Sequence, residues 1–160
     1  MSAVNYSCGK KEPAEQPDPN EIMQKITEQY LNSSGIDYYR SGKNANSVSE
    51  TKELSGEKAT ELYSRDKNKP VDLSKIEKYS ISIIDADSDG EVGIFKLYDK
   101  AGANYVKEMT QTRIAKMQDK NPGGLFSGAE ARSYGNYVYY VSHLKKDEIF
   151  ELIENKLKGV

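Results

Sequence analysis

The clearest group of residues that could do chemistry is a short acidic run. Residues 85–91 read DADSDGE, with a carboxylate at every second position and then a glycine. Oxygen ligands at positions one, three and five, followed by glycine for a sharp turn, are typical of the start of an EF-hand calcium loop. Asp85, Asp87 and Asp89 are therefore candidate ligands for a divalent cation.

Two features of this segment argue against tight calcium binding. Position twelve of an EF-hand loop holds a bidentate glutamate, but here it is Lys96, so a cation stands in place of the last ligand. The flanking residues are rich in β-formers, whereas helices flank an EF-hand loop. Asp and Gly are also common in plain turns. We therefore expect a polar hairpin turn, and the alternative is a weak calcium site.

The single cysteine, Cys8, stands at the head of a polar, proline-rich segment. A small residue before it, Gly9 after it and a following run with one aliphatic side chain resemble the mature start of a bacterial lipoprotein. The apolar stretch of a signal peptide does not precede it, and Asn5 stands where lipoproteins usually have Leu. We expect Cys8 to carry lipid in a precursor with a signal peptide, and residues 1–19 to form a disordered tether. The alternative is an unmodified thiol.

A catalytic pair or a cofactor site is not evident in the sequence. Ser142 and His143 are neighbours in a predicted strand, so their side chains point to opposite faces and cannot act together. The chain has one histidine and one cysteine, which excludes sites that need two of either. Gly123 and Gly124 lack the partners of a phosphate-binding loop. No cofactor is therefore predicted.

Tyrosine is unusually frequent, with twelve Tyr against three Phe and no Trp. Four of them cluster near the C-terminal end: Tyr134, Tyr137, Tyr139 and Tyr140. An apolar ring with a polar tip suits a recognition surface, so these residues are a candidate interaction surface. Tyrosine is also a good strand former at half-buried positions, and we favour that second interpretation.

The composition limits the classes of partner. The 160 residues carry 23 basic and 25 acidic side chains, a near-neutral balance that argues against a general nucleic-acid binder. No apolar run approaches the roughly 20 residues needed to cross a bilayer. Apolar residues make up 36% of the chain, so we expect a core drawn from part of it.

The apolar periodicity indicates which elements would position these residues. A three-to-four-residue period predicts helices over 20–31, 57–64, 99–118 and 147–158. Alternation with turn residues predicts two β-hairpins, over 79–98 and 129–143. Residues 32–56 are expected to be a loop that holds Tyr38 and Tyr39 against the core. Since sequential hairpins make an antiparallel sheet, we predict one α+β domain over 20–160, with about four strands covered in two layers by amphipathic helices.

The body of the chain resembles a known family, the bacterial lipoprotein domain of unknown function number four-three-five-eight. The resemblance covers about residues 59–159. It is carried by five segments in order: ELY (61–63), IEKYSISI (76–83), EVGIFK (91–96), TRIAKMQ (112–118) and GNYVYYVS (135–142). It implies a small extracytoplasmic domain on a lipid anchor, and it implies no reaction and no catalytic residue.

We therefore expect a non-enzymatic binding or interaction domain, lipid-anchored at the extracytoplasmic face of the cell membrane. Its partner would be an envelope protein or another ligand, it would touch the membrane only through its lipid, and it would not bind nucleic acid. One alternative is an enzyme with an unrecognised carboxylate site, for which a deep pocket with converging acids would be the sign. Another is a structural spacer or assembly subunit.

Overall fold

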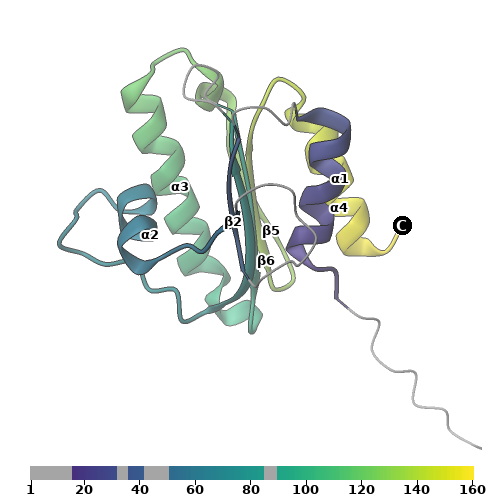
Figure 1. Cartoon of the computed structure of the whole chain (residues 1–160), viewed down its shortest axis with the longest axis horizontal. Helices are drawn as coiled ribbons and strands as arrows, with labels where there is room; N and C mark the ends of the chain where they lie inside the picture. The colour runs from purple at the N-terminus through teal and green to yellow at the C-terminus, as the bar shows by residue number, and fades with distance from the viewer. Residues whose placement is uncertain (1–15, 32–35, 42–50, 85–89) are drawn as a thin grey trace, which may run out of the picture.

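A mixed sheet forms the centre of the computed structural model, which describes residues 16–31, 36–41, 51–84 and 90–160 (Figure 1). The described part has six strands in the order β2-β1-β3-β4-β6-β5. The strands are β1 Asp37–Arg40, β2 Thr51–Lys52, β3 Ile76–Ile83, β4 Glu91–Leu97, β5 Glu130–Tyr134 and β6 Tyr137–Ser142. Five of them are antiparallel to their neighbours, and the two-residue β2 runs parallel to β1 at one edge.

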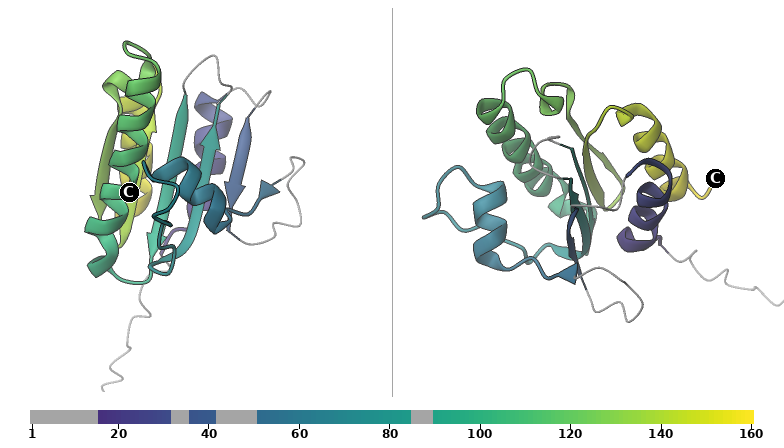
Figure 2. Two further views of the ribbon diagram at one scale, coloured as in Figure 1. Left: turned by 90° about the vertical axis from the view of Figure 1, so that its left-hand side faces the viewer. Right: turned by 45° about the horizontal axis from the view of Figure 1, so that its top comes forward.

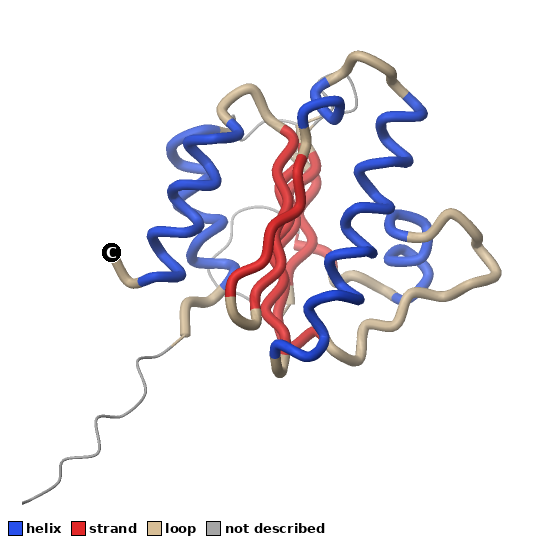
Figure 3. Tube along the Cα trace, turned by 180° about the vertical axis from the view of Figure 1, so that it is seen from behind, coloured by secondary structure: helices blue, strands red, loops and turns tan. Residues whose placement is uncertain are grey.

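Helices cover both faces of this sheet, as Figure 1 and the rear view in Figure 3 show. The α-helices are α1 Pro19–Tyr30, α2 Gly56–Tyr63, α3 Ala103–Lys120 and α4 Lys146–Lys158, and two short 3-10 helices are η1 Lys100–Gly102 and η2 Leu125–Gly128. The two views in Figure 2 show α2 and α3 side by side on one face. Helices α1 and α4 pack together on the other face.

The predicted α+β class and both antiparallel hairpins are confirmed, with five antiparallel strands rather than about four. The expectation of two layers is wrong, because the sheet is buried on both faces and the molecule has three layers. One apolar cluster joins the sheet to α2 and α3, and a second joins it to α1 and α4. Ser80 and Ser82 explain the error: both are fully buried beneath α1, although their polarity predicts a solvent face.

The helix predictions hold to within a few residues. Helix α1 begins one residue before the predicted start, and the side chain of Asp18 accepts the capping hydrogen bond. Helix α4 also begins one residue early, at Lys146, and the charge of Asp147 in its first turn suits the helix dipole. Helix α3 ends at Lys120, directly before the sequence Asn-Pro-Gly-Gly.

The expected loop over 32–56 contains two strands in its described residues. Tyr38 and Tyr39 are buried in β1, which pairs antiparallel with β3. The prediction that these tyrosines pack on the core is therefore confirmed. They do so from a strand rather than a loop, and its four residues are too few to show a recognisable strand pattern in the sequence. Among the described helices, none combines the length and the apolar character needed to cross a membrane.

Candidate functional site

A buried ion pair joins the sheet to α3. Glu91 is the first residue of β4 and Arg113 lies in the middle of α3. Two of the guanidinium nitrogens donate hydrogen bonds to the carboxylate: Nε is 3.0 Å from Oε1 and Nη2 is 2.8 Å from Oε2. The side chain of Glu91 is 1% exposed and that of Arg113 is 10% exposed. The pair is therefore almost fully removed from water.

Two tyrosines extend this pair into a chain of hydrogen bonds. The hydroxyl of Tyr140 on β6 donates to Glu91 Oε1, since an ionised carboxylate can only accept. Tyr63, the last residue of α2, donates in turn to the Tyr140 oxygen over 2.8 Å. The Tyr63 ring meets those of Phe95 and Tyr140 edge to face. The network thus links α2, α3 and two strands.

Burial and charge shift the pKa values of this network in consistent directions. Burial lowers the pKa of Arg113, but the adjacent Glu91 carboxylate outweighs burial and raises it overall, so the guanidinium stays charged. Burial, and then the Glu91 charge, raise the pKa of both Tyr63 and Tyr140. The tyrosines therefore remain neutral donors at physiological pH.

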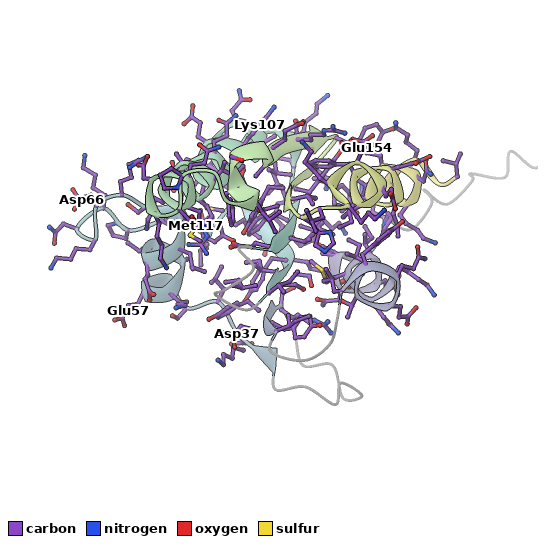
Figure 4. The ribbon with its side chains drawn as sticks, turned by 90° about the horizontal axis from the view of Figure 1, so that it is seen from above. Asp37, Glu57, Asp66, Lys107, Met117 and Glu154 are labelled. Carbon is purple, nitrogen blue, oxygen red and sulfur yellow. The ribbon has the colours of Figure 1, made fainter. Side chains whose placement is uncertain are left out.

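The ion pair lies in the wall of a pocket of about 400 Å³ between the sheet, α2 and α3. This volume falls within the roughly 300–1,000 Å³ usual for ligand pockets. The lining includes both charged and apolar side chains: Asp37, Tyr39, Lys58, Glu61, Leu62, Ile83, Ile84, Gly90, Glu91, Arg113, Met117, Lys120 and Phe126. Figure 4 shows Met117 on the side of α3 that faces α2, with Lys107 on the opposite side.

One edge of the Arg113 guanidinium remains available to this pocket. Nε and Nη2 bond to Glu91, and none of the described residues accepts a hydrogen bond from Nη1. Nη1 is also not among the buried unpartnered side-chain atoms of the described core. Because Arg113 lines the pocket, its Nη1 is the guanidinium nitrogen that could donate to an acceptor entering there.

The other acids of the pocket each have a cationic partner. Glu61 pairs with Lys58 at 3.0 Å and Asp37 with Lys52 at 3.4 Å, both at exposed positions. Among the described residues, Lys120 is the one lining cation without an ion-pair partner. Lys120 is thus the lining charge that is free to pair with a ligand.

A neighbouring lysine adds to the positive field. Lys116 Nζ donates to the carbonyl oxygens of Glu61 and Ser64 at the end of α2. Burial lowers the pKa of Lys116, and the charge of Arg113 lowers it further.

The predicted lipid and metal residues lie outside the described part of the chain. Cys8 and the three aspartates Asp85, Asp87 and Asp89 are not among the described residues. Within the residues that are described, no group of three or more His, Cys, Asp or Glu side chains could hold a metal ion. Those predictions therefore stay predictions.

The four clustered tyrosines do not form one exposed surface. Tyr137, Tyr139 and Tyr140 are at most 4% exposed, whereas Tyr134 is 43% exposed. The reason is that β6 lies inside the sheet with helices on both faces, so its alternating side chains all enter one core or the other. This corrects the candidate interaction surface and agrees with the favoured reading of these residues as strand formers.

His143 has a structural contact at the start of α4. Its Nδ1 accepts the backbone N–H of Lys145 over 2.9 Å, and burial lowers its pKa. The preceding Ser142 is fully buried in β6. His143 lies just after the end of β6, so the prediction that it shares a strand with Ser142 is wrong.

Glu91 and Arg113 were not singled out as site residues by sequence reasoning. The available signals were a glutamate opening a strand of β-formers and an arginine beside the apolar stripe of the 99–118 helix. Charges are almost never fully buried unless paired, so each signal points to an unknown partner. The partner itself could not be inferred, because only the packing of α3 on the sheet brings the two together.

Comparisons with known proteins add no relative: no family model matches the chain, and neither the curated proteins nor the solved structures include a significant match. The resemblance described above therefore rests on its sequence segments alone.

Proposed function

We propose that this chain is a non-enzymatic binding domain whose ligand site is the Arg113 pocket. In its precursor form, a lipid on Cys8 would hold the domain at the extracytoplasmic face of the cell membrane. The lipoprotein-like segment after Cys8 and the family resemblance support this location. The buried Glu91–Arg113 pair in the pocket wall is the observation that carries the binding proposal.

A buried ion pair is a poor means of stabilising a fold. Removing two charges from water costs free energy, and apolar residues of similar volume often serve equally well or better. Such a pair is easier to explain where one of its groups also meets a ligand. The Nη1 of Arg113 can give this pair such a role, because a donor held in place by Glu91 needs little reorganisation to bind an acceptor.

The charge pairing favours binding over proton transfer. A carboxylate that acts as a general acid near neutral pH needs surroundings that keep it protonated. Both oxygens of Glu91 are instead already engaged, because they accept hydrogen bonds from the Arg113 guanidinium and the Tyr140 hydroxyl. Because the pocket nonetheless holds three acids, Asp37, Glu61 and Glu91, an enzyme with a carboxylate site is the second candidate function.

The start of the described chain fits a tethered domain. The Pro17 carbonyl accepts a hydrogen bond from the Tyr137 hydroxyl at 2.7 Å, and Gln16 contacts Asn136 in the β5–β6 turn. Residues 16–17, where the described chain begins, therefore contact the fold at the β5–β6 turn end of the sheet. The pocket adjoins Gly90 and Glu91, at the other end of β4 from this turn. A ligand site far from the tether would face away from the membrane.

Equilibrium dialysis tests the binding proposal. The full chain and its Lys120→Ala variant are dialysed against a small-molecule extract of cell envelopes, and retained compounds are identified by mass spectrometry. Lys107→Ala, on the opposite side of α3, is the matched control. We expect at least one compound to be enriched by the wild type and the control and depleted with Lys120→Ala. Equal retention by all three proteins would contradict the proposal.

Fractionation tests the location separately. Native protein from the membrane fraction should carry a lipid-sized mass on the peptide that contains Cys8, and a Cys8→Ala precursor should leave that fraction. An unmodified Cys8 in membrane-extracted native protein would rule out the anchor and leave the binding proposal intact.

A further inference from the structure

The ion pairs of the described lining residues indicate which charge is free to meet a ligand. Three acids and three cations line the pocket, and each acid is in an ion pair: Glu91 with Arg113, Glu61 with Lys58, and Asp37 with Lys52, which lies outside the lining. This leaves Lys120 as the described lining cation that forms no ion pair. A negatively charged group on a ligand could pair with it.

The donors lie where they can reach one group. Arg113 and Lys120 are seven residues apart on α3, about two turns, which puts them on the same side of the helix about 10 Å apart along its axis. The Lys120 side chain is exposed and long enough to swing toward Arg113. A ligand carboxylate that accepts a hydrogen bond from Nη1 can therefore also form an ion pair with the Lys120 ammonium group.

The remaining wall of the pocket is apolar. Tyr39 and Leu62 come from β1 and α2, and Met117 and Phe126 come from α3 and η2. The Cζ atom of Arg113 also lies over the ring of Phe126, 6.0 Å from its centroid, and this contact helps to hold the guanidinium in place. These side chains would contact a hydrocarbon or aromatic body attached to the charged group.

Resting on the proposed function, we infer that the ligand of the Arg113 pocket is a small organic carboxylate with an apolar body. The carboxylate accepts hydrogen bonds from Arg113 Nη1 and pairs with Lys120, and the apolar body packs on Met117 and Phe126. A carboxylate fits better than a phosphate ester, because a second negative charge would have no unpaired cation and would lie near Glu61 and Glu91. An amine would meet the unmatched charge of Lys120 as a like charge.

Calorimetric titration of the full chain with three matched probes tests the inference. The probes are 3-phenylpropionate, 3-phenylpropionamide and 3-phenylpropylamine, which share the apolar body and differ in the polar group. We expect the carboxylate to bind at least about tenfold more tightly than the amide, and the amine not to bind. Lys120→Ala should weaken the carboxylate about fivefold or more and leave the amide unchanged, while Lys107→Ala should change neither.

The outcomes separate this inference from the proposed function. If the amide or the amine binds as tightly as the carboxylate, or if no carboxylate binding is seen at 10 mM probe, the inferred ligand class is wrong. In either case a compound enriched in the dialysis experiment would still uphold the binding function. If the carboxylate binds but Lys120→Ala does not weaken it, the inferred site is wrong.

Discussion

The ring of Tyr140 lies directly over Gly93 on the neighbouring strand. The two residues are paired in the register of β4 and β6, and a Cβ placed on Gly93 would be 2.3 Å from Cε1 of the ring. The missing side chain therefore lets the ring lie flat across the strand and brings its hydroxyl to Glu91. A glycine weakens a strand by itself, so its presence here is explained by this close approach.

Replacing Gly93 with alanine should destabilise the fold and disturb the network. Since the ring must move, we expect a loss of about 1–3 kcal/mol, the usual cost of overpacking a core. Urea unfolding followed by circular dichroism measures it. Gly128→Ala is the matched control, because nothing lies within 4 Å of its Cβ position. Equal stability of both variants would show that the Gly93–Tyr140 approach is not required.

Glu91→Gln should be among the most damaging single substitutions. It leaves the Arg113 charge buried without its counter-charge, for which we expect a loss of about 3–5 kcal/mol in the free energy of unfolding. Glu61→Gln breaks an exposed pair and should cost at most about 1 kcal/mol. If denaturant unfolding gives a similarly small loss in the free energy of unfolding for both variants, Glu91 is not needed to compensate a buried Arg113 charge.

Removing both charges should cost less than removing one. In Glu91→Met/Arg113→Met no buried charge is left unpaired, so most of the stability lost in Glu91→Gln should return. A double variant that is less stable than Glu91→Gln would indicate that the ion pair itself stabilises the fold. The double variant should also fail to bind 3-phenylpropionate, because the Nη1 donors are gone.

Stability should fall steeply in alkaline solution. Burial, followed by the charges of Glu77 and Asp18, raises the pKa of Tyr137 to about 12, against about 10 in an unfolded chain. Between those values the unfolded state releases a proton that the folded state keeps, so the free energy of unfolding decreases as pH rises. Each such tyrosine contributes a slope of up to about 1.4 kcal/mol per pH unit.

Urea unfolding at pH 9, 10 and 11 measures that slope. Burial also raises the pKa of Tyr63 and Tyr140, so they should add to the same alkaline loss. The Tyr137→Phe variant should show a shallower decrease than the wild type, by about one ionising group. An unchanged slope in this variant would mean that Tyr137 ionises equally in both states.

The sequence predicted the elements whose apolar period is long and regular. The 18-residue α3 and the hairpin β3–β4 fall where their patterns place them. The layer count was missed because a strand that carries Ser80 and Ser82 looks half-exposed. Small serines let α1 pack closely on that face and become fully buried, and only the tertiary arrangement reveals this.

The site was less accessible to sequence reasoning than the fold. Acidic residues close together in sequence, such as Asp85 and Asp87, attract attention, but Glu91 and Arg113 are 22 positions apart and on different elements. Their contact depends on how α3 crosses the sheet. Gly93 could have hinted at it, because an isolated glycine in a strand often marks a close approach by another group.

The most direct test of the account is the NMR signal of the Arg113 side chain. In the ¹⁵N-labelled full chain, the Nε–H of Arg113 should give a protected cross-peak, because it bonds to buried Glu91. Titration with 3-phenylpropionate should shift that peak saturably, together with backbone signals of Met117 and Lys120. If the Arg113 signal stays in place while the probe saturates, or if signals shift only elsewhere, the central claim that the Arg113 pocket binds the carboxylate is contradicted.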